Sequence, residues 1–313
     1  MTGAETARWL GQRLALGLLV VLGAVTAAFV AFRFMPGNPV RVLLGAATPT
    51  QAQLNQLSAQ LGYDKPAVVQ FGDYLWQLLH GNLGYSYQEQ QPVAELIGSQ
   101  LAATVELAAC ALVLALGGAV LLAVATAGRW PFARAVSSFL ELVAISAPSF
   151  WVGVLLLEVF SFRLRLLPAI GSSGPNALVL PAVTLALSVV GVFAQVLRAG
   201  MEQALGEPFV LSSRARGTGQ TAIRLRHALP HALVPLITLT GWTLGQLLSG
   251  AVIIETVFSR QGLGRVLDTA IVGRDLPVIE GVTVVSAVAF ALASIGVDWL
   301  SRTVDPRLRL VAV

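Results

Sequence analysis

The stretch EQALGEPFVLSSRARGTGQTAIRLRHALPHALVP, residues 202–235, is a polar and basic segment between two apolar runs of membrane-spanning length. It is rich in helix-forming residues and is interrupted by Gly217 and Gly219. Because the rest of the chain largely avoids charge, this segment indicates a surface outside the bilayer that another molecule uses. On composition alone, a solvated amphipathic hairpin with cytoplasmic arginines is an equal alternative to a docking loop.

The composition is that of a polytopic membrane protein. Of the 313 residues, 56% are hydrophobic and only 12% are charged, against about a quarter charged in an average soluble domain. No segment alternates as a barrel strand does. Helical spans need about 20 apolar residues, and the sequence predicts an all-α protein with six transmembrane helices, at about 14–34, 101–127, 136–160, 177–199, 233–257 and 281–300.

The distribution of positive charge predicts the orientation of these spans. The first apolar run continues to Arg33 without a small-residue cleavage site, so we expect an uncleaved span. With the N-terminus and C-terminus in the cytoplasm, twelve of the 20 Lys and Arg residues lie inside and eight outside, as the positive-inside rule favours. The pI of 9.8 then reflects topology, and we expect no nucleic-acid partner.

Several chemistries are excluded by missing residues. Lys65 is the only lysine and follows no glycine-rich turn, so this chain lacks a P-loop for ATP hydrolysis. His227 and His231 are four residues apart, but the glutamate of a zinc-protease motif is missing and Pro230 intervenes. Cys110 is the single cysteine, so no intramolecular disulfide forms. We expect neither catalysis nor a bound metal or cofactor in this chain itself.

Two helices are predicted in an extracytoplasmic segment at residues 36–98. Thr48 and Pro49 favour the start of a helix that ends at Gly62, and Pro66 favours a second that ends near Gly81. An apolar stripe on the second helix favours packing against the spans or the outer membrane face over ligand binding, with docking of an external partner as the alternative; it consists of Phe71, Leu75, Leu78 and Leu79.

Within residues 202–235 the pattern predicts a helix, a glycine turn and a second helix. The first helix is expected at 207–216, where Pro208 suits the first helical position. Gly217 and Gly219 permit a turn through positive φ. The second helix is expected at 221–229, shortened by Pro230.

Motifs along nearly the whole chain resemble, in collinear order, the dipeptide, oligopeptide and nickel permease family of binding-protein-dependent ABC importers. The segment ARG at 215–217, preceded by Glu207 and Phe209 and followed by HALPHALVP at 227–235, is similar to that family's EAA loop. The other matching segments are FMPGNPV (34–40), LGYDKP (61–66), HGNLGYS (80–86), TVELA (104–108), APSFWVG (147–153), SGAVIIETVFSRQGLGR (249–265), RDLPVIEG (274–281) and VDPRLR (304–309).

The resemblance implies the first permease subunit of a type I importer in the bacterial cytoplasmic membrane. Its implied partners are a second permease, two cytosolic ATPase subunits that carry ATP and Mg, an extracytoplasmic substrate-binding protein and the lipid bilayer. It divides the chain into a first span (1–35), the extracytoplasmic segment (36–98) and a five-helix core (99–313) with a coupling loop at 200–235. Its implied coupling residues are Glu207, Phe209, Ser212, Ser213, Arg214, Ala215, Arg216, Gly217 and Pro235.

Polar residues within the spans are candidates for the transport pathway, because polar groups in a bilayer are costly. Glu255 is the strongest gate candidate, with a structural pair to Arg260 or Arg265 as an equal alternative. Glu106, Glu158 and Asp298 lie near span ends, where contact with headgroups or pairing with arginines is favoured over cavity lining. Glu141 is expected to pair with Arg134. The remaining pathway candidates are Gln195, Thr240, Trp242, Gln246 and Ser249.

Three functions are compatible with the sequence. The leading hypothesis is a permease for dipeptides or oligopeptides, and the nearest alternative moves nickel or another small solute through the same architecture. An ion-driven secondary transporter, with buried carboxylates that relay protons, is the alternative of a different class.

Overall fold

The computed structural model describes residues 3–34, 50–60, 62–86, 88–128, 131–171 and 174–304. Helices dominate these residues, and the one sheet found in them is a hairpin in which β1 (Tyr85–Ser86) pairs antiparallel with β2 (Gln91–Pro92). Five helices are long and apolar enough to cross a membrane, or six if one bent pair forms a single span. The expectation of a helical membrane protein is confirmed at this level.

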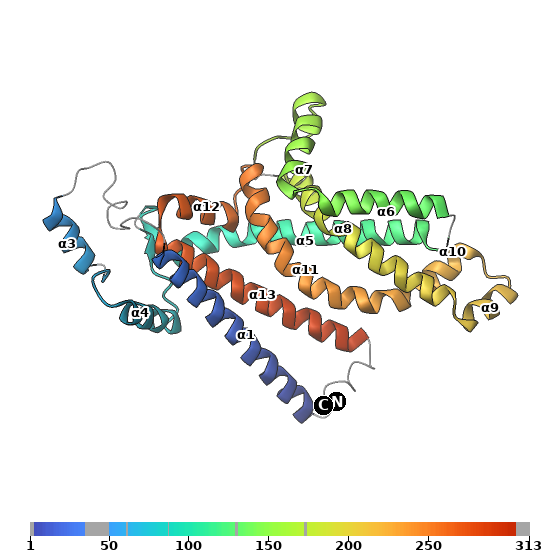
Figure 1. Cartoon of the computed structure of the whole chain (residues 1–313), viewed down its shortest axis with the longest axis horizontal. Coiled ribbons are helices and arrows are strands. Elements are labelled where there is room, and N and C mark those ends of the chain that lie inside the picture. Colours follow the sequence, from blue (N-terminus) through green and yellow to red (C-terminus); the bar gives the residue numbers. More distant parts are fainter. Residues whose placement is uncertain are drawn as a thin grey trace. The chain divides into compact units, whose positions relative to one another are not determined.

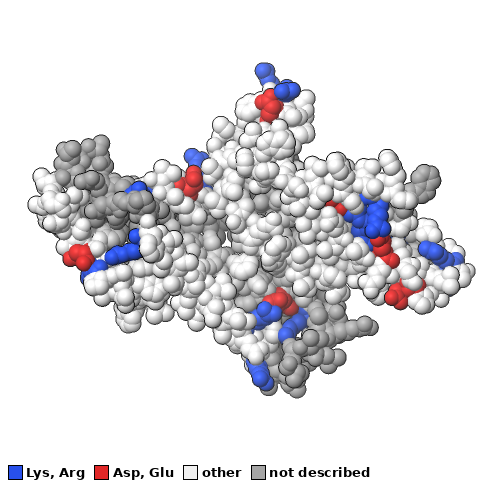
Figure 2. Space-filling model, viewed as in Figure 1, with Lys and Arg blue, Asp and Glu red and all other residues white. Residues whose placement is uncertain are grey.

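Five long helices overlap five of the six expected spans (Figure 1); they are α1 (Gly3–Arg33), α5 (Val93–Thr126), α8 (Pro175–Leu205), α11 (Leu229–Val257) and α13 (Leu276–Val304). On the face shown in Figure 2, charged side chains gather in small groups separated by wide uncharged surface. An uncharged surface is what helices that meet lipid require, since charge is costly in hydrocarbon.

The expected third span at 136–160 is not one straight helix. α6 (Pro131–Ser146) ends before Pro148, and α7 (Ser149–Leu156) continues as the π-helical η1 (Leu157–Arg163) in a direction bent by 103° (Figure 1). Pro148 has φ −58° and an extended ψ of 130°, which is outside the helical range. Because proline lacks an N–H and disfavours helical geometry in the residue before it, the helix breaks at Ala147 and Pro148.

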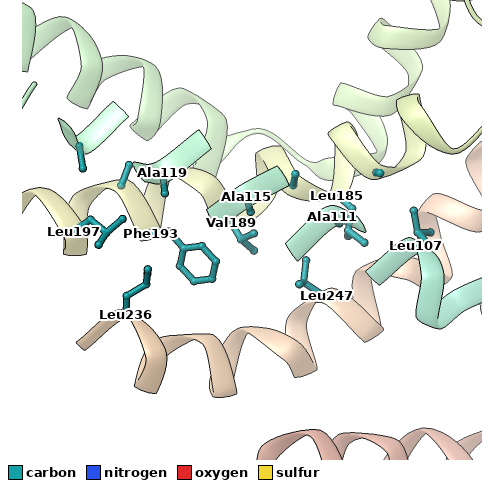
Figure 3. Close-up of a cluster of buried hydrophobic side chains, with 14 of the residues drawn as sticks. Leu107, Ala111, Ala115, Ala119, Leu185, Val189, Phe193, Leu197, Leu236 and Leu247 are labelled. Carbon is teal, nitrogen blue, oxygen red and sulfur yellow. The ribbon is translucent and has the colours of Figure 1, made fainter. Parts of the chain in front are cut away.

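The chain forms two compact units: residues 1–103 with 262–291, and residues 104–261 with 292–313. In the second unit an alanine row with four-residue spacing on α5 is fully buried, and it includes Ala111, Ala115 and Ala119 (Figure 3). Phe193 of α8 and Leu247 of α11 belong to the same buried cluster. Small side chains on α5 allow close helix packing, which membrane helices use in place of a hydrophobic driving force.

The core of the first unit joins the start of α5 to α12 (Leu263–Gly273) and the start of α13. A Cβ on Gly281 would lie 2.5 Å from Val93, so only glycine allows this approach of α13 to α5. The buried Ser86 hydroxyl donates a hydrogen bond to Asp275, which ties the hairpin to the residue before α13.

The segment expected at 36–98 contains two helices outside the candidate spans, α3 (Gln51–Gln60) and α4 (Ala67–Leu79). The expected start at Thr48 and Pro49 lies outside the described residues, and Thr50 caps α3 by a reciprocal pair of hydrogen bonds with Gln53. α4 follows Pro66 and ends before Gly81, which has φ +74°, so its expected limits are confirmed. Phe71 packs on Phe29 of α1, whereas Leu79 is exposed.

The close contact of α6 with α8 predicts that adding one methyl group at Gly191 lowers the stability of the chain. A Cβ on Gly191 would lie 2.8 Å from the carbonyl oxygen of Glu141, which is backbone and cannot move aside cheaply. We therefore expect Gly191→Ala to lower the stability of the purified chain by about 1–3 kcal/mol, measured as a fall in its thermal unfolding midpoint in detergent. The control is Gly117→Ala, which meets no atom within 4 Å; equal midpoints for the two variants would contradict this packing.

Candidate functional site

The loop at 200–235 contains the short helix α9 (Pro208–Ala215), which follows α8 after a break at Gly206 and Glu207. Glu207 precedes it in an extended conformation and Pro208 occupies its first turn, as the sequence predicted. The helix ends in a Schellman motif, in which the N–H of Thr218 bonds to the Ser213 carbonyl and that of Gly217 to the Arg214 carbonyl. Gly217 has φ +79°, a conformation that glycine adopts without strain.

Only one of the two expected turn glycines has positive φ. Gly219 has φ −66° and an extended ψ, and it immediately precedes α10 (Gln220–Ile223). The expectation of positive φ at Gly219 is therefore wrong, because a single αL residue completes the Schellman motif. Gly219 instead begins the second helix in a conformation that any residue adopts.

The second loop helix does not stop at Leu229. α10 runs through a π-helical turn, η2 (Arg224–Ala228), directly into α11. The helical stretch from Gln220 to Val257 is long and apolar enough to cross a membrane as one span. In the π turn the N–H of Leu229 bonds to the Arg224 carbonyl, five residues earlier. This wider turn precedes Pro230 and accommodates its ring, so the expected shortening is wrong. Pro235 lies inside α11.

One face of α9 is buried and the other is exposed. Val210 and Ser213 are each only 2% exposed, and the Ser213 hydroxyl donates to the Phe209 carbonyl. Phe209 packs against the rings of His227 and His231, with centroids 6.3 and 5.4 Å apart, so these histidines have a packing role. The opposite surface, which we call the α9 outer face, consists of Leu211, Ser212, Arg214, Ala215, Arg216 and Gly217.

Buried and half-buried polar contacts anchor the base of this loop to the helices around it. Arg224 of η2 is buried and donates to the Gly128 carbonyl just after α5, at 3.3 Å. Arg134 of α6 pairs with Glu202 near the end of α8, at 3.2 Å. These contacts hold the helical segments on either side of α9 to the end of α5 and to α6.

A further anchor is a buried ion pair between Arg198 of α8 and Glu141 of α6. Glu141 also accepts from the Ser137 hydroxyl at 2.6 Å, and Arg198 donates to the Thr126 hydroxyl of α5 at 3.2 Å. The expected Glu141–Arg134 pair is wrong, since Arg134 pairs one turn further along α8 with Glu202. Which arginine pairs with Glu141 depends on how α6 packs against α8, and residue spacing within α6 carries no information on that packing.

A second polar cluster joins α5 to the end of α11. Glu255 is fully buried and accepts from the Thr104 hydroxyl at 2.6 Å. The buried Arg260 pairs with Glu106 at 2.6 Å, and its N–H bonds to the Glu255 carbonyl. Glu106 thus has an arginine partner, as expected, and so does Glu158, which pairs with Arg163. Sequence reasoning missed the burial of Arg260, for which it has no signal.

The pathway candidates divide into different environments. Trp242, Gln246 and Ser249 are all exposed and recur at helical spacing, so they share one face of α11, which we call the α11 stripe. Gln195 is exposed on α8. Thr240 is half-buried, donates to the Leu236 carbonyl and lines an apolar groove of about 740 Å³ in the second unit, whereas Glu255 is buried away from solvent.

Comparison with known proteins identifies the class. Residues 115–310 match the family model of the binding-protein-dependent transport system inner membrane component, and residues 7–108 match the N-terminal model of the same kind of membrane component. The structure is similar to an inward-facing conformation of the MetNI methionine ABC transporter, with a TM-score of 0.55 and 21% identity, over 67% of this chain and 96% of that one. That likeness supports the fold alone.

Two curated relatives cover almost the full length. A putative peptide transport system permease protein of Brucella abortus is 33% identical over 95% of this chain and 98% of its own length. The glutathione transport system permease protein GsiC of Salmonella choleraesuis is 33% identical over 94% of this chain and 96% of its own. The chain belongs to the family of binding-protein-dependent ABC importer permeases, and it is a multi-pass protein of the bacterial inner membrane. Membership of this family excludes the alternative of an ion-driven secondary transporter.

The buried ion pair gives a prediction for stability. Removing one partner leaves an uncompensated buried charge, so we expect Arg198→Met to destabilise the chain by about 3–5 kcal/mol. The matched variant Arg134→Met breaks an ion pair whose arginine is 57% exposed, and we expect a loss of at most about 1 kcal/mol. Thermal unfolding in detergent measures both, and an Arg198→Met protein as stable as Arg134→Met would exclude the anchoring role of the buried pair.

Proposed function

We propose that this chain is the first of two permease subunits of a bacterial peptide importer. It pairs with a second, similar permease, two cytosolic ATPase subunits and an extracytoplasmic binding protein that delivers substrate. ATP and Mg bind to the ATPase subunits, and no cofactor binds to this chain. Family membership supports the kinds of partner, and the names of the two relatives, a peptide and a glutathione permease, support dipeptides or oligopeptides as substrates.

The proposed topology has six spans and both termini in the cytoplasm. The bent pair α6 and α7 counts as one span, which makes the total even and returns the C-terminus to the side of the N-terminus. Twelve of the 20 positive charges then lie in the cytoplasm. In this topology the hairpin and α3, α4 and α12 are extracytoplasmic, and α9 is cytoplasmic.

The α9 outer face is the proposed contact with an ATPase subunit. The exposure of this face is the observation that carries the proposed mechanism. A docking element needs an exposed surface and a stiff connection to the parts that it moves. α9 offers Leu211, which is 72% exposed, beside Arg214 and Arg216. Arg224 fixes the helix that follows it to the end of α5. Closure of the ATPase pair therefore moves α9 together with α8 and α11, as a rigid element that transmits a displacement.

The α11 stripe is the proposed lining of the transport pathway. A glutamine and a serine on the outer face of a membrane helix are costly against lipid but favourable against water or a second permease. Trp242 adds a large aromatic surface to the same face and is 68% exposed in the isolated chain. Glu255 has a supporting role in this proposal, because its bond to Thr104 holds α11 to α5.

The central experiment is reconstitution of the complete importer in proteoliposomes. We expect ATPase activity to rise when the binding protein is loaded with a dipeptide, a longer peptide or glutathione, and labelled peptide to accumulate inside. Stimulation by nickel alone would select the small-solute alternative instead. Failure of every peptide to stimulate the complex would reject the proposed substrate class.

Gly217→Val tests the loop. Valine in a positive-φ conformation costs about 1–2 kcal/mol, so the Schellman end of α9 should distort. We expect peptide-stimulated ATPase activity to fall about tenfold in the reconstituted importer, while the amount of assembled complex stays unchanged. Gly219→Val is the matched control, since Gly219 has negative φ and open space around it. Equal activities for the two variants would remove the case for α9 as the coupling helix.

Gln246→Leu tests the stripe. Leucine keeps the size of the side chain and removes its amide, so we expect slower peptide uptake per ATP hydrolysed, by about threefold, with normal assembly. Thr240→Val provides the comparison, because Thr240 faces the apolar groove and its hydroxyl bonds within its own helix. A defect in Thr240→Val together with normal uptake in Gln246→Leu would assign the pathway to the other face of α11.

A further inference from the structure

The first unit contains a polar pocket that the coupling loop and the α11 stripe do not use. Its volume is about 410 Å³, within the range of small-molecule sites. It lies among α1, α3, α4, the residues before β1 and the first turns of α13. Phe29, Tyr63, Tyr74 and Tyr85 give it an aromatic lining, and Glu280 contributes a carboxylate.

Glu280 is the unusual member of this lining. It is only 6% exposed, and its Oε1 atom has no hydrogen-bond partner among the described residues. A buried carboxylate is costly unless a cation or hydrogen-bond donors compensate its charge. The site therefore lacks the group that would balance it.

The cationic residue of the lining, Lys65, is already paired with another carboxylate. Its Nζ lies 2.8 Å from a carboxylate oxygen of Asp73, and both side chains are about half exposed. The hydrogen bond to Asp73, with the negative charge of that carboxylate, raises the pKa of Lys65. Lys65 and Asp73 thus neutralise each other at the rim, and no cationic side chain of the lining is left to pair with Glu280.

Tyr74 adds a second unused polar group. Its hydroxyl is buried, lines the same pocket and has no hydrogen-bond partner among the described residues. Burial raises the pKa of Tyr74, and the negative charge of Glu280 raises it further. Tyr74 and Glu280 both line this pocket, so one ligand in it can contact both groups.

We propose that this pocket binds a primary ammonium group, with Glu280 as its counter-ion and Tyr74 as a hydrogen-bonding partner. An ammonium supplies both the positive charge and the N–H donors that the carboxylate lacks, and tyrosine and phenylalanine faces attract cations. A divalent metal fits less well, since the described residues contain no group of three potential metal-ligating side chains. The proposal does not depend on the transported substrate or on the coupling mechanism.

Two sources carry this chemistry. Phe29 lies near the end of α1 and Glu280 near the start of α13, so the pocket is at one boundary of the membrane, where aromatic residues are enriched and lipid headgroups lie. One source is the ethanolamine headgroup of a phospholipid. The other is a free amine from the aqueous side, such as the N-terminus of a short peptide.

The test uses the purified full chain in nanodiscs and measures binding alone. In discs of phosphatidylglycerol only, radiolabelled ethanolamine and glycylglycine are titrated by scintillation proximity, with tetramethylammonium, which has no N–H, as competitor. In parallel, discs with equal phosphatidylethanolamine and phosphatidylglycerol are analysed by native mass spectrometry for the lipid that the chain retains. Retained phosphatidylethanolamine assigns the lipid source, and binding of a soluble probe assigns the free amine.

For whichever probe binds, we expect Glu280→Gln to weaken binding about tenfold, because the amide keeps the shape and loses the charge. Tyr74→Phe should weaken it about threefold and keeps the proposal testable if Glu280→Gln does not fold. Asp268→Asn, which removes an exposed carboxylate of α12, is the matched control and should bind as the unmodified chain does. If no ammonium probe binds the unmodified chain, the proposal is wrong and the pocket holds only water. Equal binding by the pocket variants and the control would reject it in the same way.

Discussion

The buried ion pair between Arg198 and Glu141 is the constraint on which the arrangement around the loop depends. Two buried charges on apolar helices are tolerated only when they meet, and α6 and α8 pack closely where Gly191 lets their backbones approach. Ser137 and Thr126 supply further hydrogen bonds, which bring α5 into the same network. α8 therefore reaches the start of the loop from a fixed position, and the α9 outer face is presented by a supported helix.

Proline has opposite consequences at two places in this chain. Pro148 ends α6 and turns the chain by 103°, whereas Pro230 lies in a helix that continues to Val257. The difference is the π turn at Arg224–Ala228, which precedes Pro230 and changes the hydrogen-bond register before the ring is reached. The unbroken helix connects the loop to the α11 stripe, so the proposed contact with the ATPase and the proposed pathway belong to one mechanical element.

Of the six spans that hydropathy predicted, five are single long helices, because the hydrocarbon core sets their length. The turn at Gly217 was also predicted, because glycine permits the positive φ that is found there. The partner of Glu141, the burial of Arg260 and the pocket at Glu280 were not predicted. Each depends on contacts between helices distant in sequence, to which spacing within one helix is blind. The break at Pro148 was missed for another reason: the apolar run continues through it, and hydropathy does not detect a bend.

The most direct test of the central claim, that α9 contacts an ATPase subunit, is site-specific cross-linking in the assembled importer with Cys110→Ala as background. Ser212→Cys and Ser213→Cys place the same probe on adjacent residues, of which Ser212 is exposed and Ser213 is buried. The account predicts a nucleotide-dependent cross-link to the ATPase from position 212 and little or none from position 213. Absence of a cross-link from position 212 in every nucleotide state would contradict it.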